Sequence, residues 1–411
     1  MSERRITFPP APGGIFALDP LPRILTADEA SALRNGVAQR VRALELFLAD
    51  VYGEQRTLAD GLVPRRAVEK SPHYEPAMRG APVTRWISFA GLDVARSPDG
   101  RFSVIEDQVR MPSGLAYAVA ARETLRDLLP VSAPQADLSG AYAELARALR
   151  EATPADEPRM VLLCEGRDAA AWWEHQLLGR LLDAPAVTLA DLQRRGDRLL
   201  AWIDGHPRPV DLVYQRTEED RFTGPDGRRT AVGEALLEPC CAGTLACVNA
   251  PGSGVADDKV VHAHVDRLVR ELLGEEPLLP SIPSFDLGDD EDRRTALDRL
   301  DSLVVKPRGE MGGDDVVLWR DAGGKVREQT LALLEREPAG WIAQELVTLS
   351  VHPTVCEGEL RPCHVDLRPY VLVSDGGVAV AGALSRVALE PGSMIVNSGQ
   401  GGGAKDTWLP D

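Results

Sequence analysis

The chain has 411 residues, of which 44% are hydrophobic and 27% are charged, and its formal net charge is −17. This length and this hydrophobic content predict a globular protein of two or three domains. A strongly negative protein repels a phosphate backbone, so the composition disfavours DNA or RNA as a partner.

The sequence shows no membrane or secretory signal. No apolar run reaches the ~18 residues of a membrane span, and residues 1–14 lack the apolar core of a signal peptide. The six cysteines include no Cys-x-x-Cys pair, which is typical of a reducing compartment. We therefore expect a cytoplasmic protein without a membrane partner and without a zinc–thiolate site.

The first predicted elements are an extended arm, a long helix and a β-hairpin. Residues 1–22 are rich in proline and predict the arm, and the segment 26–29, Thr-Ala-Asp-Glu, has the pattern of a capping box that opens a helix to about Leu48. Residues 83–107 predict two strands joined by the turn Ser-Pro-Asp-Gly at 97–100. Two further helices are predicted at 114–129 and 139–152.

From Arg159 onward, strand and helix patterns alternate, which is typical of α/β structure. The first part predicts an open-sheet domain with one helix, AAWWEHQLLGRLL. The later segment VVHAHVDRLVRELL predicts a helix that ends at Gly274, and residues 277–283 predict a linker. The remaining predicted elements are the strands LVVKP, VVLW, WIAQELV, HVDLRPYVLV and GVAVAGALSRVA, the helix REQTLALLERE and a glycine-rich tail, NSGQGGGAKDTW.

Two common phosphate-binding motifs are excluded by their spacing. A P-loop places its lysine directly after glycine, whereas Lys259 follows aspartate and Lys405 follows alanine. A dinucleotide-binding fingerprint needs a third small residue at the position where this chain has Asp257.

Lysine is rare in this chain, and its placement indicates phosphate chemistry. Only five of the 46 basic residues are lysine. Lys259 starts a predicted helix, Lys306 ends an apolar strand before glycines, and Lys405 lies just after three glycines. Helix N-termini and glycine-rich loops supply N–H donors to the anion that a lysine also binds. The alternative for Lys306 is a solvated strand end.

The predicted hairpin carries three oxygen donors. Asp93 lies on one strand, and Glu106 and Gln108 lie two residues apart on the next, so that all three can point to one face of the sheet. Such donors on adjacent strands suit Mg²⁺. The alternative is a solvated face of the hairpin.

Dispersed metal ligands and dispersed phosphate lysines, without a P-loop or kinase motifs, suggest the ATP-grasp architecture. The chain resembles the circularly permuted ATP-grasp family, relatives of eukaryotic glutathione synthetase and of bacterial glutathionylspermidine synthetase. The resemblance runs in order from about residue 80 to the end, with the metal-binding strands before the lysine strands, which is the signature of the permutation. The segments that carry it are GLDVARSPDGRFSVIEDQVRMPSGLAY, VNAPGSGVADDKVVHAHV, VVKPRGEMGGDD, HVDLRPYVL and SMIVNSGQGGGAKDTW.

The resemblance implies an α/β (α+β) fold of the circularly permuted ATP-grasp type, in which two α+β lobes clamp ATP beside an open-sheet α/β domain on the substrate side. The expected division is an arm at 1–22, helices and the metal-binding hairpin of the core at 23–135, the open-sheet domain at 136–250, the lid lobe at 251–345 and the C-terminal core lobe at 346–411.

The resemblance also implies a role for each matching residue. The metal ligands would be Asp93, Glu106, Gln108 and the loop acid Glu310. ATP would be bound by Lys259, Lys306, Gly312, Gly313, the interlobe segment Gln344, Glu345, Leu346 and Val347, and by Asn397, Gly401, Gly402 and Lys405. Catalysis would use Arg386, Lys306 and Arg368. The acid substrate would contact Arg110, Ser113 and Gly114, and Arg216 would be a further substrate residue.

This chain departs from the family pattern at two of these positions. Gln108 stands where relatives usually have asparagine, which is one methylene shorter. Either the strand would lie slightly further from the metal ions, or one of the two ions would be bound less well. Met311 stands where another glycine is expected, which would stiffen the loop.

The function that the resemblance implies is that of an ATP-dependent carboxylate–amine ligase. It would use ATP and two Mg²⁺ ions, form an acyl phosphate, join it to an amine and release ADP and phosphate. Its expected partners are a small-molecule or peptide carboxylate and an amine, and a homo-oligomer is left open. Two alternatives stay open: an inactive ATP-binding module that regulates a partner protein, and an ATP-grasp kinase that stops at a phosphorylated product.

Overall fold

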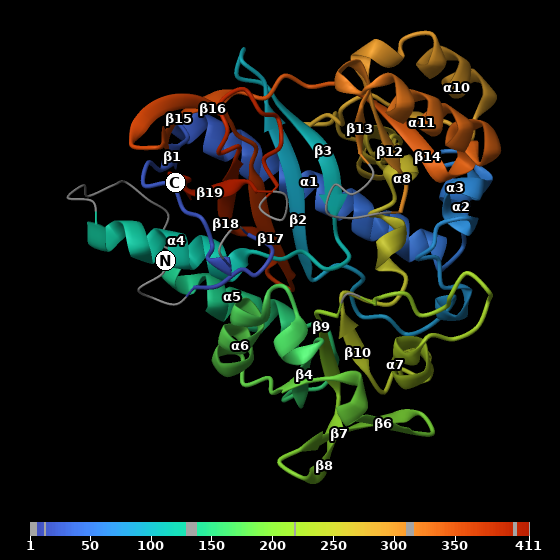
Figure 1. Ribbon diagram of the computed structural model, residues 1–411. Coiled ribbons are helices and arrows are strands. Elements are labelled where there is room, and N and C mark those ends of the chain that lie inside the picture. The colour runs from blue at the N-terminus through green and yellow to red at the C-terminus, as the bar shows by residue number, and fades with distance from the viewer. Residues whose placement is uncertain are drawn as a thin grey trace.

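The computed structural model describes residues 6–11, 14–128, 138–217, 219–309, 316–397 and 401–410. Figure 1 shows a large sheet, an upper lobe that contains α10 (Asp290–Leu297) and α11 (Gly324–Arg336), and a lower part built from residues 159–250. None of the helices in these ranges is long and apolar enough to span a membrane.

The large sheet has six strands in the order β1-β19-β18-β17-β2-β3. These strands are β1 (Arg23–Ile24), β2 (Phe89–Arg96), β3 (Phe102–Gln108), β17 (Arg368–Ser374), β18 (Gly377–Val387) and β19 (Gly403–Trp408). The predicted hairpin is therefore present as β2 and β3. Its register places Asp93 opposite Glu106 and Gly91 opposite Gln108.

Helices cover both faces of this sheet (Figure 1). One face packs on α1 (Ala27–Val51), which begins with the predicted capping box at Thr26, and the other face packs on α4 (Leu115–Leu128) and α5 (Ala141–Arg150). Because successive strand residues point to opposite faces, Leu92 packs in the cluster of α1 whereas Phe89 packs in that of α4 and α5. Asp93 follows Leu92 and therefore points to the second face.

The upper lobe has its own sheet and core. Its strands run in the order β11-β14-β12-β13, with bounds β11 (Ser284–Asp286), β12 (Leu303–Pro307), β13 (Val317–Leu318) and β14 (Trp341–Glu345). Backbone hydrogen bonds attach the preceding linker to β3, from Val104 N to Pro280 O at 2.9 Å and from Ile282 N to Val104 O at 3.0 Å. Residues 255–269, which the predicted division assigned to this lobe, instead contribute buried side chains to the core of α1.

The lower part contains the predicted open sheet. Its parallel strands run in the order β10-β9-β4-β5, and its elements are β4 (Met160–Leu163), α6 (Trp172–Leu181), β5 (Ala186–Val187), β9 (Leu212–Gln215), α7 (Ala231–Cys241) and β10 (Ala246–Val248). An antiparallel meander projects from it (Figure 1), made of β6 (Leu192–Arg195), β7 (Arg198–Ile203) and β8 (His206–Val210).

Several segments differ from the sequence prediction. The helix expected after Lys259 is divided into α8 (Lys259–His262), α9 (Val265–Leu268) and a π-helical turn (Val269–Leu273) that ends at Gly274, whose φ is 68°. The glycine-rich tail contains the buried strand β19, because pairing with β1 and β18 satisfies its backbone groups. The elements α7, α10 and the hairpin of β15 (Val351–Cys356) and β16 (Glu359–His364) were not predicted.

Candidate active site

A cavity of about 960 Å³ lies where the large sheet, the upper lobe and the lower part meet. Eleven of the residues that the sequence singled out line it: Asp93, Glu106, Gln108, Ser113, Gly114, Arg216, Lys259, Lys306, Arg368, Arg386 and Asn397. They come from positions up to about 300 residues apart in the chain. The structure thus brings the predicted cation, carboxylate and substrate positions into one space.

Two lysines face the carboxylate of Glu106 in this cavity. Lys259 Nζ lies 3.0 Å from Glu106 Oε1, and Lys306 Nζ donates a hydrogen bond to Gln344 Oε1 at 2.6 Å. Burial lowers the pKa of Lys306 to about 8, against the opposing effect of Glu106. Burial acts to raise the pKa of Glu106, but Lys259 and Lys306 hold it below its ordinary value. The lysines therefore keep Glu106 ionised.

Asp93 is held by two arginines, one from the adjacent strand β17 and one from β18, the strand beyond it. Arg368 Nε donates to Asp93 Oδ1 at 2.7 Å, and Arg386 Nη2 donates to Asp93 Oδ2 at 2.8 Å. Arg386 also donates from Nε to Asp366 Oδ1 at 3.0 Å. Although burial acts in the opposite direction, Arg368 and Arg386 lower the pKa of Asp93 to about 2. This ion-pair group orients both guanidinium groups at the cavity wall.

The oxygen donors fit a hard cation only in part. Glu106 and Gln108 offer carboxylate and amide oxygens from one face of β3, which is the donor type that Mg²⁺ prefers. Both oxygens of Asp93 are engaged by guanidinium groups. Within the described ranges no group of three His, Cys, Asp or Glu side chains could hold a metal ion. The predicted ligand Glu310, and Gly312 and Gly313 of the predicted phosphate loop, lie outside the described residues.

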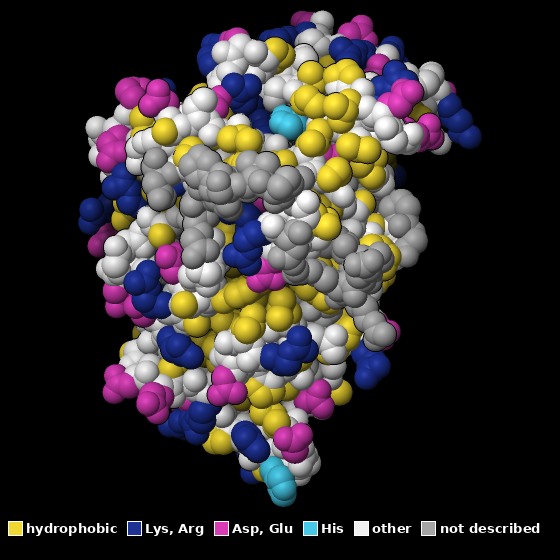
Figure 2. Space-filling view, turned by 90° about the vertical axis from the view of Figure 1, so that its left-hand side faces the viewer, with side chains coloured by type: hydrophobic (Ala, Val, Ile, Leu, Met, Phe, Trp, Pro, Cys, Tyr) yellow, Lys and Arg dark blue, Asp and Glu magenta, His cyan; other side chains and the backbone are white. Residues whose placement is uncertain are grey.

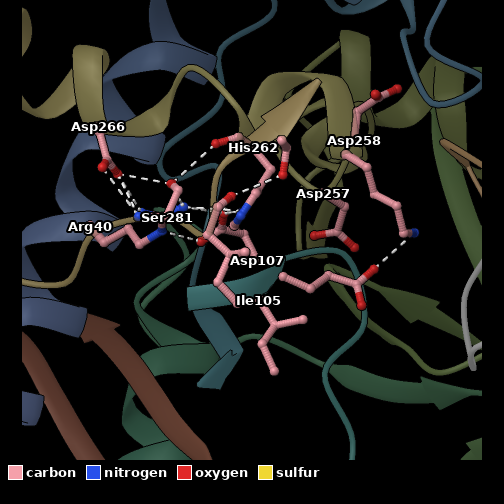
Figure 3. A network of polar contacts seen from close by, with 12 residues as sticks. Arg40, Ile105, Asp107, Asp257, Asp258, His262, Asp266 and Ser281 are labelled. Carbon is pink, nitrogen blue, oxygen red and sulfur yellow. Dashed lines mark hydrogen bonds and ion pairs between the residues drawn. The ribbon is translucent and has the colours of Figure 1, made fainter. Parts of the chain in front are cut away.

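A network of buried polar side chains holds β3 against α1 and α8 (Figure 3). Asp107, between Glu106 and Gln108, accepts hydrogen bonds from Arg40 Nε at 2.6 Å and Nη2 at 2.9 Å, and its Oδ2 lies 2.8 Å from His262 Nδ1. His262 belongs to α8, the helix that Lys259 begins. The network therefore ties the strand that carries Glu106 to the helix that carries Lys259. Arg40 Nη2 also donates to Ser281 Oγ in the linker, at 2.9 Å.

The predicted substrate positions Ser113 and Gly114 lie just before α4. The backbone N–H of Gly114 is 3.0 Å from Glu174 Oε1, and the N–H of Ala116 is 2.9 Å from the same oxygen. The side chain of Glu174 thus occupies the N-terminus of α4, a position that could otherwise bind an anion. Arg216 donates to Pro112 O at 2.6 Å, and its Nη2 lies 3.8 Å from Glu174 Oε2.

Other predicted residues lie outside the cavity wall. Arg110 forms an ion pair with Asp220, at 2.8 Å, and Lys405 is buried against Asp19. In the interlobe segment, the N–H of Glu345 donates to Pro283 O at 2.9 Å and that of Leu346 to Ser302 O at 3.0 Å, while Val347 packs beside the small cluster that includes Leu349. The N–H of Gly402, which follows Gly401, donates to Asn397 O at 2.9 Å. The backbone of these segments is thus already engaged within the protein.

Sequence reasoning missed three side chains that belong to this site: Glu174, His175 and Tyr370. Tyr370 follows Arg368 by two residues on β17, so the period of a strand could have placed it on the same face. Glu174 and His175 reach the site through the fold of α6, and their local sequence gives no signal.

Comparison with known proteins identifies relatives along nearly the whole chain. Residues 22–388 match the family model described as circularly permuted ATP-grasp type 2. A protein of Frankia alni named "Putative glutamate--cysteine ligase 2-3" is 43% identical over 408 residues, which cover 96% of this chain and 47% of that relative. The chain therefore spans about half the length of this relative. An uncharacterized protein of Mycobacterium leprae is 37% identical over 406 residues, which cover 96% of this chain and 72% of the relative.

A solved structure shares the fold. A glutathione synthetase-like effector from Globodera pallida, in its apo form, superposes with a TM-score of 0.63 at 10% sequence identity, covering 96% of this chain and 90% of that chain. At this identity the likeness concerns the fold alone.

Proposed function

Since the chain belongs to the circularly permuted ATP-grasp type 2 family, we propose that it is an ATP-dependent ligase that activates a carboxylate as an acyl phosphate and joins it to an amine. The observation that supports this most is the convergence of Lys259, Lys306, Arg368 and Arg386 with Glu106 and Gln108 on one cavity. Four cations beside oxygen donors are what phosphoryl transfer requires, since its catalysis is mainly positioning and neutralisation of charge.

The proposed reaction needs no covalent bond to the protein. An oxygen of the carboxylate attacks the γ-phosphorus of ATP, so that an acyl phosphate forms and ADP leaves. The amine then attacks the acyl carbon, phosphate leaves, and the amine loses one proton. In this scheme Lys259 and Lys306 bind the phosphates, and Arg386 and Arg368, oriented by Asp93, neutralise the charge on the transferred group.

Mg²⁺ would neutralise the triphosphate and polarise the transferred group when bound. Glu106 and Gln108 would hold it, with Glu310 as a further candidate. Asp93 could also coordinate Mg²⁺ only if one of its carboxylate oxygens gave up its hydrogen bond to Arg368 or Arg386. The cytoplasm, which supplies ATP and Mg²⁺ together, is the proposed location.

We also propose a separate role for two parts of the chain. The upper lobe, residues 284–345, would act as the lid over ATP, and the open-sheet domain, within 136–250, would contribute to the substrate side. The name of the Frankia relative makes glutamate and cysteine the first acid and amine to test.

The test is ADP release from the full chain with a panel of acids and amines, followed by mass spectrometry of the product. The ligase proposal expects ADP release that requires both an acid and an amine, and a product whose mass equals their sum minus water. The variant Lys306→Met should lose this activity, whereas Lys325→Met should retain it because Lys325 is exposed on α11. ADP release that needs the acid alone would indicate a kinase, and ATP binding without ADP release would indicate an inactive module.

A further inference from the structure

One part of the cavity wall, which we call the aromatic end, is mostly apolar. Its wall residues are Phe8, Phe16, Tyr117, Ala169, Ala170 and Ala171, together with Glu165, His175, Arg216 and Thr217. The rings of Phe16 and Tyr117 stack at a centroid distance of 4.5 Å, and Phe8 meets Tyr117 edge-on at 5.8 Å. Figure 2 shows that hydrophobic side chains also gather in the middle of one face of the molecule, between interspersed basic and acidic ones.

The two ends of the cavity differ in charge. At the lysine end, the described wall residues include four cations, Lys259, Lys306, Arg368 and Arg386, and three carboxylates, Asp93, Glu106 and Asp366. At the aromatic end, the cation Arg216 faces the buried Glu174 at 3.8 Å, and Glu165 adds a second carboxylate. Glu165 accepts a hydrogen bond from Thr217 Oγ1 at 2.5 Å. Among the described wall residues of this end, its carboxylate favours a cationic ligand over a second carboxylate.

Two buried polar side chains at this end have no hydrogen-bond partner among the described residues. His175 is 3% exposed and both of its ring nitrogens lack a partner, and Tyr370 is 0% exposed and its hydroxyl lacks one. Buried polar groups are nearly always hydrogen-bonded, and both side chains line the cavity, so both are available to bind a ligand there. Burial, assisted by Arg216, lowers the pKa of His175 to about 3. Its imidazole is therefore neutral and offers one acceptor nitrogen.

Tyr370 connects the two ends. It lies on β17, two residues after Arg368. The charges of Arg368, Arg386, Asp93 and Glu174 all act on the pKa of its phenol. A molecule bound at the aromatic end would thus lie next to the groups to which we assign phosphoryl transfer. This is where the second substrate of a ligase has to bind.

We propose, on the basis of the ligase function above, that the aromatic end is the amine subsite and takes a primary ammonium on an apolar body. The carboxylate of Glu165 supplies the opposite charge, and the imidazole of His175 accepts an N–H hydrogen bond. An ammonium brings three N–H donors, and the aromatic rings favour a cation next to an apolar group.

The first experiment measures binding without turnover. Phenethylamine, which is an ammonium near neutral pH, and hydrocinnamate, which carries a carboxylate on the same phenylethyl body, are titrated into the full chain by calorimetry. We expect phenethylamine to bind about tenfold more tightly than hydrocinnamate, because a charge-assisted hydrogen bond typically contributes this much. Equal or tighter binding of hydrocinnamate would overturn the proposal.

Variants locate that binding. Glu165→Gln and His175→Phe should each weaken phenethylamine about tenfold and leave the affinity for ATP unchanged. The matched controls Glu157→Gln and His206→Phe, at exposed positions, should bind phenethylamine like the wild type. If His175→Phe does not fold, Glu165→Gln carries the test by itself. Unchanged phenethylamine binding in Glu165→Gln would overturn the assignment.

A second experiment separates this proposal from the ligase function. Hydroxylamine replaces the amine in the ADP-release assay and converts an acyl phosphate to a hydroxamate and phosphate, without needing an apolar wall. Glu165→Gln should keep hydroxamate formation and raise the KM for the amine about tenfold. If wild type forms no hydroxamate with any acid, the ligase function fails while the binding experiment still decides the subsite. A raised KM for the acid in Glu165→Gln would assign this end to the acid and overturn the proposal.

Discussion

Arg386 Nη2 donates to Asp93 Oδ2 at 2.8 Å, so a predicted catalytic cation and a predicted metal ligand are partners of each other. The sequence places these residues 293 positions apart and assigns them separate tasks. In the structure, Asp93 first acts as the anion that holds Arg386 and Arg368 at the cavity wall.

Replacing Asp93 with asparagine separates these two tasks. Asp93→Asn keeps the shape but leaves the guanidinium of Arg368 with a neutral partner, while Arg386 keeps its ion pair with Asp366, so we expect the free energy of unfolding to fall by about 3 kcal/mol. Urea denaturation without nucleotide and without metal measures this loss. The control is Asp99→Asn in the exposed turn between β2 and β3. A variant as stable as wild type, whose Mg²⁺ requirement nevertheless rises, would show that Asp93 is a metal ligand first.

Lys306 should bind phosphate only while it is protonated. Lys306→Met removes a charge-assisted contact, so we expect ATP affinity to fall about 10- to 100-fold, whereas Lys70→Met and Lys325→Met, at exposed positions, should change it little. Because the pKa of Lys306 is lowered to about 8, its charged fraction decreases as pH rises through that value. The difference in affinity between wild type and Lys306→Met should therefore shrink above pH 8. A difference that stays constant to pH 10 would contradict the role of the charge.

Much of the site follows from strand periodicity. Asp93, Glu106 and Gln108 were predicted to share a face because residues at period two do so, and the register of β2 and β3 brings them to one cavity. Lys259 and Lys306 were identified from their local setting beside a helix start and before glycines. These features depend on neighbouring residues in the chain, which is why they can be recognised in a single sequence.

Other features depend on pairs that no local pattern contains. Glu174 caps α4 from another helix, 60 residues away from Gly114, and β19 becomes a strand only through its pairing with β1 and β18. Glycine spacing in the tail indicates a flexible loop, and tertiary pairing overrides that preference. The ion pair of Lys405 could not be predicted either, because its position after three glycines does not indicate that it pairs with Asp19 in the folded protein.

Metal binding should depend on Glu106 and on the length of Gln108. Glu106→Gln keeps the shape but removes an anionic oxygen, so turnover should be lost while most of the ATP affinity remains. Gln108→Asn restores the residue expected in relatives, yet the shorter amide should fall short of a metal that is held at about 2.0 to 2.1 Å. The Mg²⁺ concentration for half-maximal rate should therefore rise. An asparagine variant that works as well at low Mg²⁺ would place Gln108 outside the metal's ligands.

Lys405 should stabilise the fold without binding ATP. Its side chain is 0% exposed and that of its partner Asp19 is 1% exposed, and Nζ also donates to Pro353 O at 3.0 Å. Lys405→Met leaves the buried carboxylate of Asp19 without its cation, which typically costs about 3 to 5 kcal/mol. We therefore expect a large loss in the free energy of unfolding, measured in urea, with ATP affinity per folded molecule unchanged by calorimetry. The double variant with Asp19→Leu should recover part of the loss, because no unpaired charge then remains buried. Loss of ATP affinity at full stability would instead return Lys405 to the phosphate-binding residues that the sequence suggested.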